Sequence, residues 1–342
     1  MSRPREHFVY WGTGTESSFE AHGRIAVMSS KKPAVDLIIP IFNEEGVVEH
    51  THEGICRVVD SLAYEFQFIY VDDGSSDGTA DALRKIGERD ARISLLQLSR
   101  NFGHQAALTA GMDASRGEVV ITMDGDGQHP PEMIPQMLDL IAQGYDVVQT
   151  QRVDAAQPAS FKKWTSGFFY RLINLISGTR VPPGTADYRA LSRQAVDAIK
   201  TMPEYHRFLR GMVSWIGFST VILPYQPAER ISGKSKYSLG KMIRLAMDAV
   251  FSFSLVPLYI GLSLGAVLFC LAALEMVYVL SFWVTGRTSN LAPGWSSLMF
   301  VILIVGGMLM ALLGFIGVYV GYIFQEVKRR PVYLIKGEPR NE

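Results

Sequence analysis

Short apolar runs rich in β-branched residues alternate with amphipathic stretches through the first half of the chain. Each apolar run has the length of a buried strand, and each amphipathic stretch has the length of a helix. The strands expected on this basis span residues 35–40, 66–71, 93–98, 118–123 and 146–150, and a helix follows each of the first four. This alternation predicts an α/β fold with a mostly parallel sheet and helices on both faces.

Two longer apolar segments, 254–284 and 296–325, lie toward the C-terminus. Each exceeds the roughly 20 residues that a helix needs to cross a bilayer. Basic residues flank the pair on its outer sides, at positions 241, 244 and 328–330, whereas the loop between the segments carries only Arg287. The positive-inside rule therefore predicts two transmembrane helices in the plasma (inner) membrane, with the α/β domain and both chain termini in the cytoplasm.

These patterns divide the chain into four parts. Residues 1–33 are polar and are expected to form a disordered N-terminal extension, in which Met28 is an alternative start to Met1. Residues 34–240 form the expected cytoplasmic domain, and residues 241–330 the juxtamembrane segment with both membrane helices. Residues 331–342 form a cytoplasmic tail, in which a short strand is expected at 331–335.

Two features of the sequence have more than one structural interpretation. The amphipathic helix expected at 162–177 is aromatic and basic, and it either lies in the headgroup plane of a membrane or packs on the protein's own core. Glu275 falls within the first membrane segment, where an acid is a functional candidate, although a paired or protonated structural group is the favoured interpretation.

Composition and charge limit the kinds of partner and the cellular compartment that we expect for this chain. The 342-residue chain has a formal net charge of zero, which gives no support for nucleic-acid binding. Its two cysteines, Cys56 and Cys270, fall in the α/β domain and in a membrane segment, so a disulfide between them is not expected and a reducing compartment fits. Glycines at 306, 307, 314, 317 and 321 give the second membrane segment a face suited to close helix packing, which points to a homo-oligomer.

The loop Asp124-Gly125-Asp126-Gly127-Gln128 follows the most central apolar run. In extended chain, residues two apart share a face, so we expect Asp124, Asp126 and Gln128 to converge beyond the carboxyl end of the strand. Ligands bind at this end of an open α/β sheet, and Mg²⁺ or Mn²⁺ bound to phosphates fits such oxygen ligands. The alternative is an Asp-Gly loop that merely turns the chain.

Other polar residues also follow predicted strands. Asp72 and Asp73 end the second strand and Arg152 follows the fifth, so we expect them at the same edge of the sheet as the acidic loop. Arg207 and Arg210 are spaced i, i+3 for one face of a helix. His50 and His52 would face different directions on a helix, and we interpret both as surface residues.

A basic, glycine-containing loop precedes the membrane segments. We expect an anion-binding site in this loop, formed by Arg230, Lys234, Lys236 and Lys241. One interpretation is attraction to acidic lipid, worth about 1 kcal/mol per cation. The other is a loop that closes over phosphates.

Several separate blocks resemble family 2 glycosyltransferases, and most closely the polyisoprenyl-phosphate glycosyltransferases. That group includes bactoprenol glucosyltransferases and dolichol-phosphate mannose synthases. The blocks are IPIFNE at 39–44, VDDGSSDGT at 71–79, RNFG at 100–103, DGDGQHPPE at 124–132, ADYR at 186–189, RFLRG at 207–211 and RISGKSKY at 230–237. Many blocks in one order are more specific than any single motif.

The resemblance implies a GT-A nucleotide-sugar-binding fold and a role for each matching position. The nucleotide sugar would be bound by Pro40, Phe42, Glu44, Asp72, Asp73, Asp124 and Gln128. The metal would be held by Asp124, Asp126 and Gln128, and phosphates of donor or acceptor by Arg152, Arg207, Arg210, Arg230, Lys234 and Lys236. Asp187 matches an acid thought to be catalytic in the family, acting together with Asp126 and Arg152. Gly125 and Gly127 depart from the family's frequent Asp-Ala-Asp-Leu-Gln, which makes the loop more flexible and leaves the choice of donor open.

The function implied is an inverting, divalent-metal-dependent transfer of a sugar to a polyprenyl (undecaprenyl) phosphate, with glucose from UDP-glucose as the preferred choice. The nucleophile would be a phosphate oxygen that is already ionised near pH 7, so a strong general base is not required and a literal base role for Asp187 is disfavoured. The alternatives are the use of GDP-mannose or a catalytically inactive membrane scaffold or nucleotide sensor. Membrane lipid is an expected partner, and a tetramer is suggested only by analogy.

Overall fold

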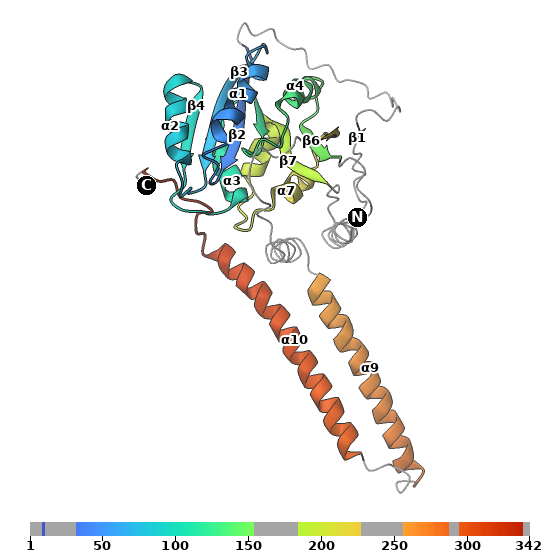
Figure 1. Cartoon of the computed structure of the whole chain (residues 1–342). Helices are drawn as coiled ribbons and strands as arrows, with labels where there is room; N and C mark the ends of the chain where they lie inside the picture. The colour runs from blue at the N-terminus through green and yellow to red at the C-terminus, as the bar shows by residue number, and fades with distance from the viewer. Residues whose placement is uncertain (1–8, 11–31, 154–183, 227–255, 287–293, 338–342) are drawn as a thin grey trace. The chain divides into compact units, whose positions relative to one another are not determined.

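The computed structural model describes residues 9–10, 32–153, 184–226, 256–286 and 294–337 (Figure 1). The chain divides into two compact units. The first comprises Met1–Asn174, Thr179–Tyr237 and Pro331–Glu342, and the second comprises Leu175–Gly178 and Ser238–Arg330. Each unit is described by itself.

One mixed sheet organises the first unit. Its strands are β1 Val9–Tyr10, β2 Ala34–Ile41, β3 Glu65–Asp72, β4 Ile93–Gln97, β5 Val119–Thr122, β6 Val147–Arg152, β7 Thr185–Ser192 and β8 Thr220–Tyr225. They lie in the order β1-β8-β6-β7-β5-β2-β3-β4. β7 runs antiparallel to both of its neighbours, β5 and β6, and every other pairing is parallel. The mostly parallel sheet expected from the sequence is confirmed, and β7 is the strand that runs in the opposite direction.

Helices cover both faces of the sheet (Figure 1). Among the described residues of this unit, the helices are α1 Val48–Val59, α2 Thr79–Arg89, α3 His104–Ala114, α4 Ile134–Ala142 with a 3₁₀ turn η1 Pro131–Met133 before it, α6 Arg193–Lys200 and α7 Leu209–Trp215. α1, α2 and α4 pack together on one face, while α3, α6 and α7 pack on the other. The central strands are buried on both sides, which explains their unbroken apolar runs.

Gly111 lets α3 lie close to β2. A Cβ atom added at this position would overlap the side chain of Ile38 in β2. Close packing of this helix fixes where its first residue, His104, lies relative to the carboxyl ends of the strands.

Two expectations need correction. Val9–Tyr10 lies in the stretch expected to be disordered, yet it pairs with β8 as an edge strand. Arg207 and Arg210 do not share a helix face, because α7 begins at Leu209.

The C-terminal tail pairs with the edge of β4. Leu98 and Ile335 form an isolated antiparallel bridge, the amide of Ser99 donates to the carbonyl of Leu334 at 2.8 Å, and the amide of Lys336 donates to the carbonyl of Gln97 at 2.7 Å. The short strand expected at 331–335 is thus present as one bridge.

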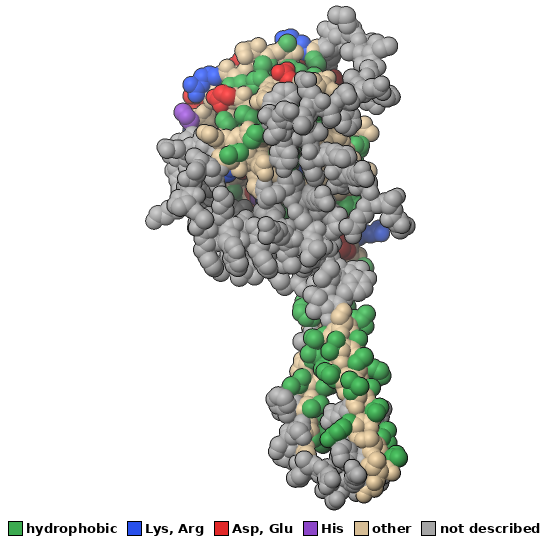
Figure 2. Space-filling view, turned by 90° about the vertical axis from the view of Figure 1, so that its right-hand side faces the viewer, with side chains coloured by type: hydrophobic (Ala, Val, Ile, Leu, Met, Phe, Trp, Pro, Cys, Tyr) green, Lys and Arg blue, Asp and Glu red, His purple; other side chains and the backbone are tan. Residues whose placement is uncertain are grey.

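The second unit contains two long helices, α9 Val256–Val284 and α10 Trp295–Val327. Among the described residues, one stretch, Ile304–Val327, is long and apolar enough to cross a membrane, and Gly261–Leu271 is a shorter apolar stretch. Hydrophobic side chains lie exposed along the described parts of these helices (Figure 2). A pair of membrane spans therefore stays a prediction.

Candidate active site

The acidic loops and Arg152 meet at one edge of the sheet, as the sequence predicts. β2, β3, β5, β6 and β8 all end there, because they run in the same direction. The antiparallel β7 begins there, with Thr185 opposite Gln151. The hydroxyl of Thr122, the last residue of β5, donates to the carbonyl of Asp187 at 2.6 Å, so β7 delivers Asp187 beside the acidic loop.

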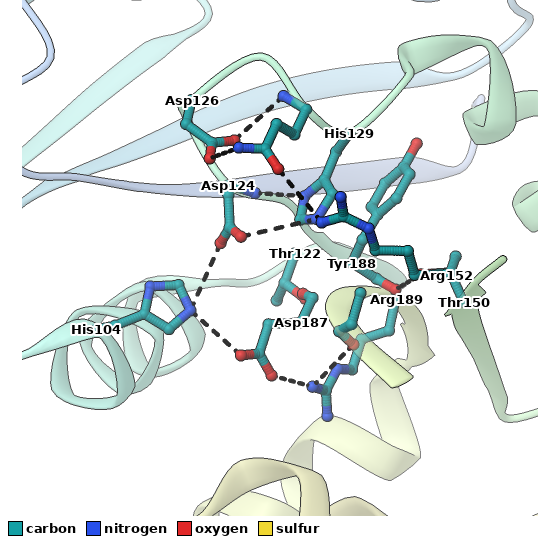
Figure 3. Close-up of polar contacts among 12 residues, drawn as sticks. His104, Thr122, Asp124, Asp126, His129, Thr150, Arg152, Asp187, Tyr188 and Arg189 are labelled. Atoms are coloured by element: carbon teal, nitrogen blue, oxygen red, sulfur yellow. Dashed lines mark hydrogen bonds and ion pairs between the residues drawn. The ribbon is translucent and has the colours of Figure 1, made fainter. Parts of the chain in front are cut away.

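The acidic loop is a turn and not an extension of β5. The strand ends at Thr122, and Gly127 has a positive φ of 73°. Gln128 donates to Asp126 through its backbone amide at 3.1 Å and its side-chain amide at 2.8 Å, whereas the Asp124 carboxylate points toward His104 (Figure 3). The extended backbone assumed for this loop is therefore absent, and the convergence of the three side chains on one cation stays a prediction.

Asp124 retains an unused acceptor. Its Oδ1 is buried and accepts no hydrogen bond from the described residues, although His104 Nε2 lies 3.5 Å away. A buried anionic oxygen without a donor is costly unless a cation or proton satisfies it. The loop also supplies carboxylate and amide oxygens, which are the ligands that Mg²⁺ and Mn²⁺ prefer. The chemistry of these oxygens fits a divalent cation, which Asp124, Asp126 and Gln128 would hold.

Asp187 is buried among basic groups. It contacts the guanidinium of Arg189, accepts from Arg210 Nη2 at 2.9 Å and Nε at 3.2 Å, and lies 3.4 Å from His104 Nε2. Burial alone would raise the pKa of Asp187, but Arg210, His104 and Arg189 outweigh it and hold the pKa well below its usual value. A carboxylate stabilised in this way is a poor proton acceptor, which agrees with the doubt about a base role.

His104 is a site residue for which no role was expected from the sequence. It opens α3, its side chain is 39% exposed, and its Nε2 lies between Asp124 and Asp187 (Figure 3). Burial would lower the pKa of His104, but the two carboxylates raise it overall. Its position directly after the RNFG block was the available signal.

The positions expected to bind the nucleotide lie along the ends of β2 and β3. Pro40 is buried in β2 opposite Val71, while Phe42 and Glu44 are partly exposed just beyond the strand. The backbone amide of Glu44 donates to Thr79 Oγ1 at 3.0 Å, which ties this loop to the start of α2.

Asp72 and Asp73 are buried and have protein partners. Asp72 accepts from the amide of Ser75 at 2.9 Å. Asp73 accepts from the amides of Phe102 at 2.7 Å and Gly103 at 2.9 Å, and so holds the loop before His104. Burial raises the pKa of Asp73, and these two amides offset part of that rise.

The basic positions separate into three groups. Arg152 Nη1 lies 3.4 Å from Gln128 Oε1, and Arg210 binds Asp187, so both belong to the site. Arg207 instead donates to the carbonyl of Met202 at 2.6 Å. Arg230, Lys234, Lys236 and the amphipathic stretch 162–177 lie outside the described residues.

His52 is buried, which overturns its interpretation as a surface residue. Its Nδ1 lies 3.0 Å from Tyr70 Oη, and its Nε2 lies 3.5 Å from Cys56 Sγ and 3.4 Å from Asp90. These three residues could in principle hold a metal. However, Arg92 Nη2 lies 2.8 Å from Asp90 and 3.5 Å from Cys56, and burial raises the pKa of Cys56 to about 11. A guanidinium and a protonated thiol disfavour a cation, so this cluster serves the packing of α1.

Comparisons with known proteins identify the family of this chain. The model of the family described as Glycosyl transferase family 2 matches residues 36–200. An uncharacterized glycosyltransferase, YkcC, of Bacillus subtilis is 36% identical over 300 residues, which cover 88% of this chain and 92% of the relative. A prophage bactoprenol glucosyl transferase homolog of Escherichia coli is 35% identical over 306 residues, covering 88% and 98%. The bactoprenol glucosyl transferase of Shigella phage SfII is 34% identical over 310 residues, covering 90% and 98%.

Among solved structures, mannosyl-3-phosphoglycerate synthase from Rubrobacter xylanophilus matches with a TM-score of 0.46 and 17% identity, covering 64% of this chain and 72% of that chain. The sheet with its single reversed strand is a GT-A-like α/β fold. Because full-length relatives exceed a third in identity over most of both chains, the chain belongs to glycosyl transferase family 2, in the group of the bactoprenol glucosyl transferases.

Proposed function

We propose that this enzyme transfers glucose from UDP-glucose to a polyprenyl phosphate, with undecaprenyl phosphate as the acceptor, and inverts the anomeric centre. The buried, unsatisfied Asp124 oxygen beside Asp126, Gln128 and Arg152 carries this proposal, because it supports a cation and a diphosphate at the carboxyl end of the sheet. The names of the Escherichia coli and phage relatives support the lipid acceptor.

A cation bound by Asp124, Asp126 and Gln128 would neutralise charge on the leaving nucleoside diphosphate. The protein's own residues then have to bring two anions together. Arg152 lies against Gln128 and is placed to contact a diphosphate held by this loop. Arg210 is only 25% exposed and is oriented by Asp187, which suits contact with one phosphate in a fixed direction.

Asp187 acts in this scheme through its partners. Its negative charge holds Arg210, Arg189 and His104 within one cluster and offsets their mutual repulsion. The attacking phosphate oxygen is largely ionised near neutral pH and needs no proton removed. Asp187 is therefore a positioning residue and not the base.

The membrane location belongs to the same proposal. A polyprenyl phosphate keeps its tail in the bilayer, so an enzyme anchored by α9 and α10 meets this acceptor at the headgroup plane. The apolar stretch Ile304–Val327 supports such an anchor.

A donor panel tests the proposal. Purified full-length protein, undecaprenyl phosphate and Mg²⁺ or Mn²⁺ are incubated with UDP-glucose, UDP-galactose, UDP-N-acetylglucosamine or GDP-mannose, and the glycolipid is identified by mass spectrometry. We expect product with UDP-glucose, in the β configuration by NMR, and none with Asp126→Asn. If only GDP-mannose gave product, GDP-mannose would replace UDP-glucose as the assigned donor. If no donor gave product, the result would favour a catalytically inactive scaffold or nucleotide sensor.

A further inference from the structure

His129 belongs to the DGDGQHPPE block but has no role in the scheme above. It is 5% exposed and lies beside Asp124 and Tyr188 (Figure 3). Its ring stacks on Tyr188 with centroids 4.8 Å apart and 13° between the planes, and Tyr225 meets it edge-on at 6.0 Å. Tyr188 is itself fixed by a hydrogen bond of 2.9 Å from its hydroxyl to the carbonyl of Pro130.

The contacts of this ring determine its tautomer. The backbone amide of Asp124 donates to His129 Nδ1 at 2.8 Å, so Nδ1 is an acceptor and carries no hydrogen. The neutral ring then carries its hydrogen on Nε2, which lies 3.7 Å from Asp124 Oδ2. One rigid ring thus bonds the backbone of Asp124 and faces one oxygen of its carboxylate.

This arrangement closes the acidic loop at its base. The bond from the Asp124 amide to His129 joins the first residue of the loop to the residue just after Gln128. With Oδ2 facing His129, the other oxygen of Asp124, Oδ1, is the one left without a donor. Glycines at 125 and 127 would otherwise leave the loop free to change shape.

We propose that His129 is a positioning residue for the cation, because it sets the conformation of the acidic loop and aims Asp124 Oδ1 into the site. The inference rests on the cation role proposed for this loop. Residues that orient metal ligands typically change metal affinity by about 10 to 100-fold when they are replaced.

Two substitutions separate this role from packing. Both His129→Asn and His129→Gln remove the ring and its stacking on Tyr188. Asparagine keeps an oxygen acceptor near the position of Nδ1, whereas glutamine reaches the position of Nε2 and loses the acceptor that the Asp124 amide uses. A packing role predicts equal effects, and the positioning role predicts different ones.

The affinity of the full-length protein for Mn²⁺ is measured by electron paramagnetic resonance, with UDP present and without lipid acceptor. We expect His129→Gln to bind Mn²⁺ about tenfold or more weakly than His129→Asn does. Excess Mn²⁺ should restore the transfer rate of His129→Gln, which a folding defect would not allow.

Asp124→Asn shows whether the measured Mn²⁺ is bound at the acidic loop. This variant should lose the Mn²⁺ binding whose affinity the two His129 variants change. Equal affinities in His129→Asn and His129→Gln would overturn the inference while leaving the proposed function intact. Mn²⁺ binding that survives in Asp124→Asn, or no binding by the unaltered protein, would overturn both the inference and the cation role.

Discussion

At the scale of single residues, the site is organised by Asp187 rather than by an exposed base. Its carboxylate neutralises Arg189, which is 1% exposed, and contacts both Arg210 and His104. Removing one partner of a buried ion pair leaves the other charge uncompensated in a region of low polarity. Stability and activity therefore depend on the same side chain.

Asp187→Asn should lower the free energy of unfolding by about 3 kcal/mol, because Arg189 stays buried without its anion. The transfer rate should fall by a factor that is the same from pH 6 to pH 9, since the low pKa of Asp187 keeps it ionised throughout that range. Urea unfolding and rate–pH profiles measure both effects. Asp197→Asn, at a carboxylate that is 59% exposed, is the control and should change neither. A loss that varies with pH would restore the base role.

His52 makes stability depend on pH. Burial lowers the pKa of His52 despite the nearby Asp90, whereas the unfolded chain takes up this proton near pH 6.5. The unfolded state therefore binds more protons below that pH, and the stability of the fold decreases as the pH falls through about 6.5.

His52→Gln should flatten this decrease between pH 7 and pH 5, even if it lowers stability at pH 7. Urea unfolding midpoints at a series of pH values measure the slope. His50→Gln, at an exposed histidine of the same helix, should keep the slope of the unaltered protein. An unchanged slope in His52→Gln would assign the acid sensitivity to other groups.

The sequence identified site residues that follow strands, and it missed those set by side-chain packing. Asp124 and Asp187 stand in recognisable blocks and Arg152 ends β6, so the topology of the sheet brings them together. His104 follows the RNFG block and His129 lies within the DGDGQHPPE block, but their contacts are with residues distant in sequence, Asp187 and Tyr188, which these blocks do not reveal. The burial of His52 likewise depends on Tyr70 and Asp90, contacts that helical periodicity does not specify.

At the scale of elements, strands β2 to β6 were predicted closely, whereas β1, β8 and the reversal of β7 were not. Apolar runs fix where strands lie, but either direction of a strand buries the same side chains. The direction of β7 follows from its partners on β5 and β6, which are distant in sequence. The same limit applies to the tail, whose single bridge to Leu98 pairs residues far apart in the chain.

Two helical glycines should respond in opposite ways to alanine. Gly111→Ala should lower the free energy of unfolding by about 1 to 3 kcal/mol, because the new methyl group overlaps Ile38 and pushes α3 from β2. Gly87→Ala in α2 meets only Ile93, at an ordinary contact distance of 3.8 Å, and should raise stability by about 0.5 to 1 kcal/mol. Thermal unfolding of both variants measures the difference. Equal effects of the two substitutions would contradict the close approach of α3 and β2.

At the scale of the whole molecule, the proposed arrangement of two membrane spans predicts a labelling pattern. Ser289→Cys, in the loop between the long helices, should react with an impermeant maleimide on intact cells. Glu342→Cys in the tail should react only after lysis. Cys56→Ser and Cys270→Ala in both variants remove background labelling. Labelling of position 342 in intact cells would exclude two spans with a cytoplasmic tail.

The reversed β7 also has a consequence for how this family can diversify. Because β6 ends and β7 begins at the same rim, the connection between Arg152 and Thr185 leaves and re-enters the sheet beside the reacting groups. Insertions between these two strands would therefore begin and end next to the site without changing the order of the strands in the sheet.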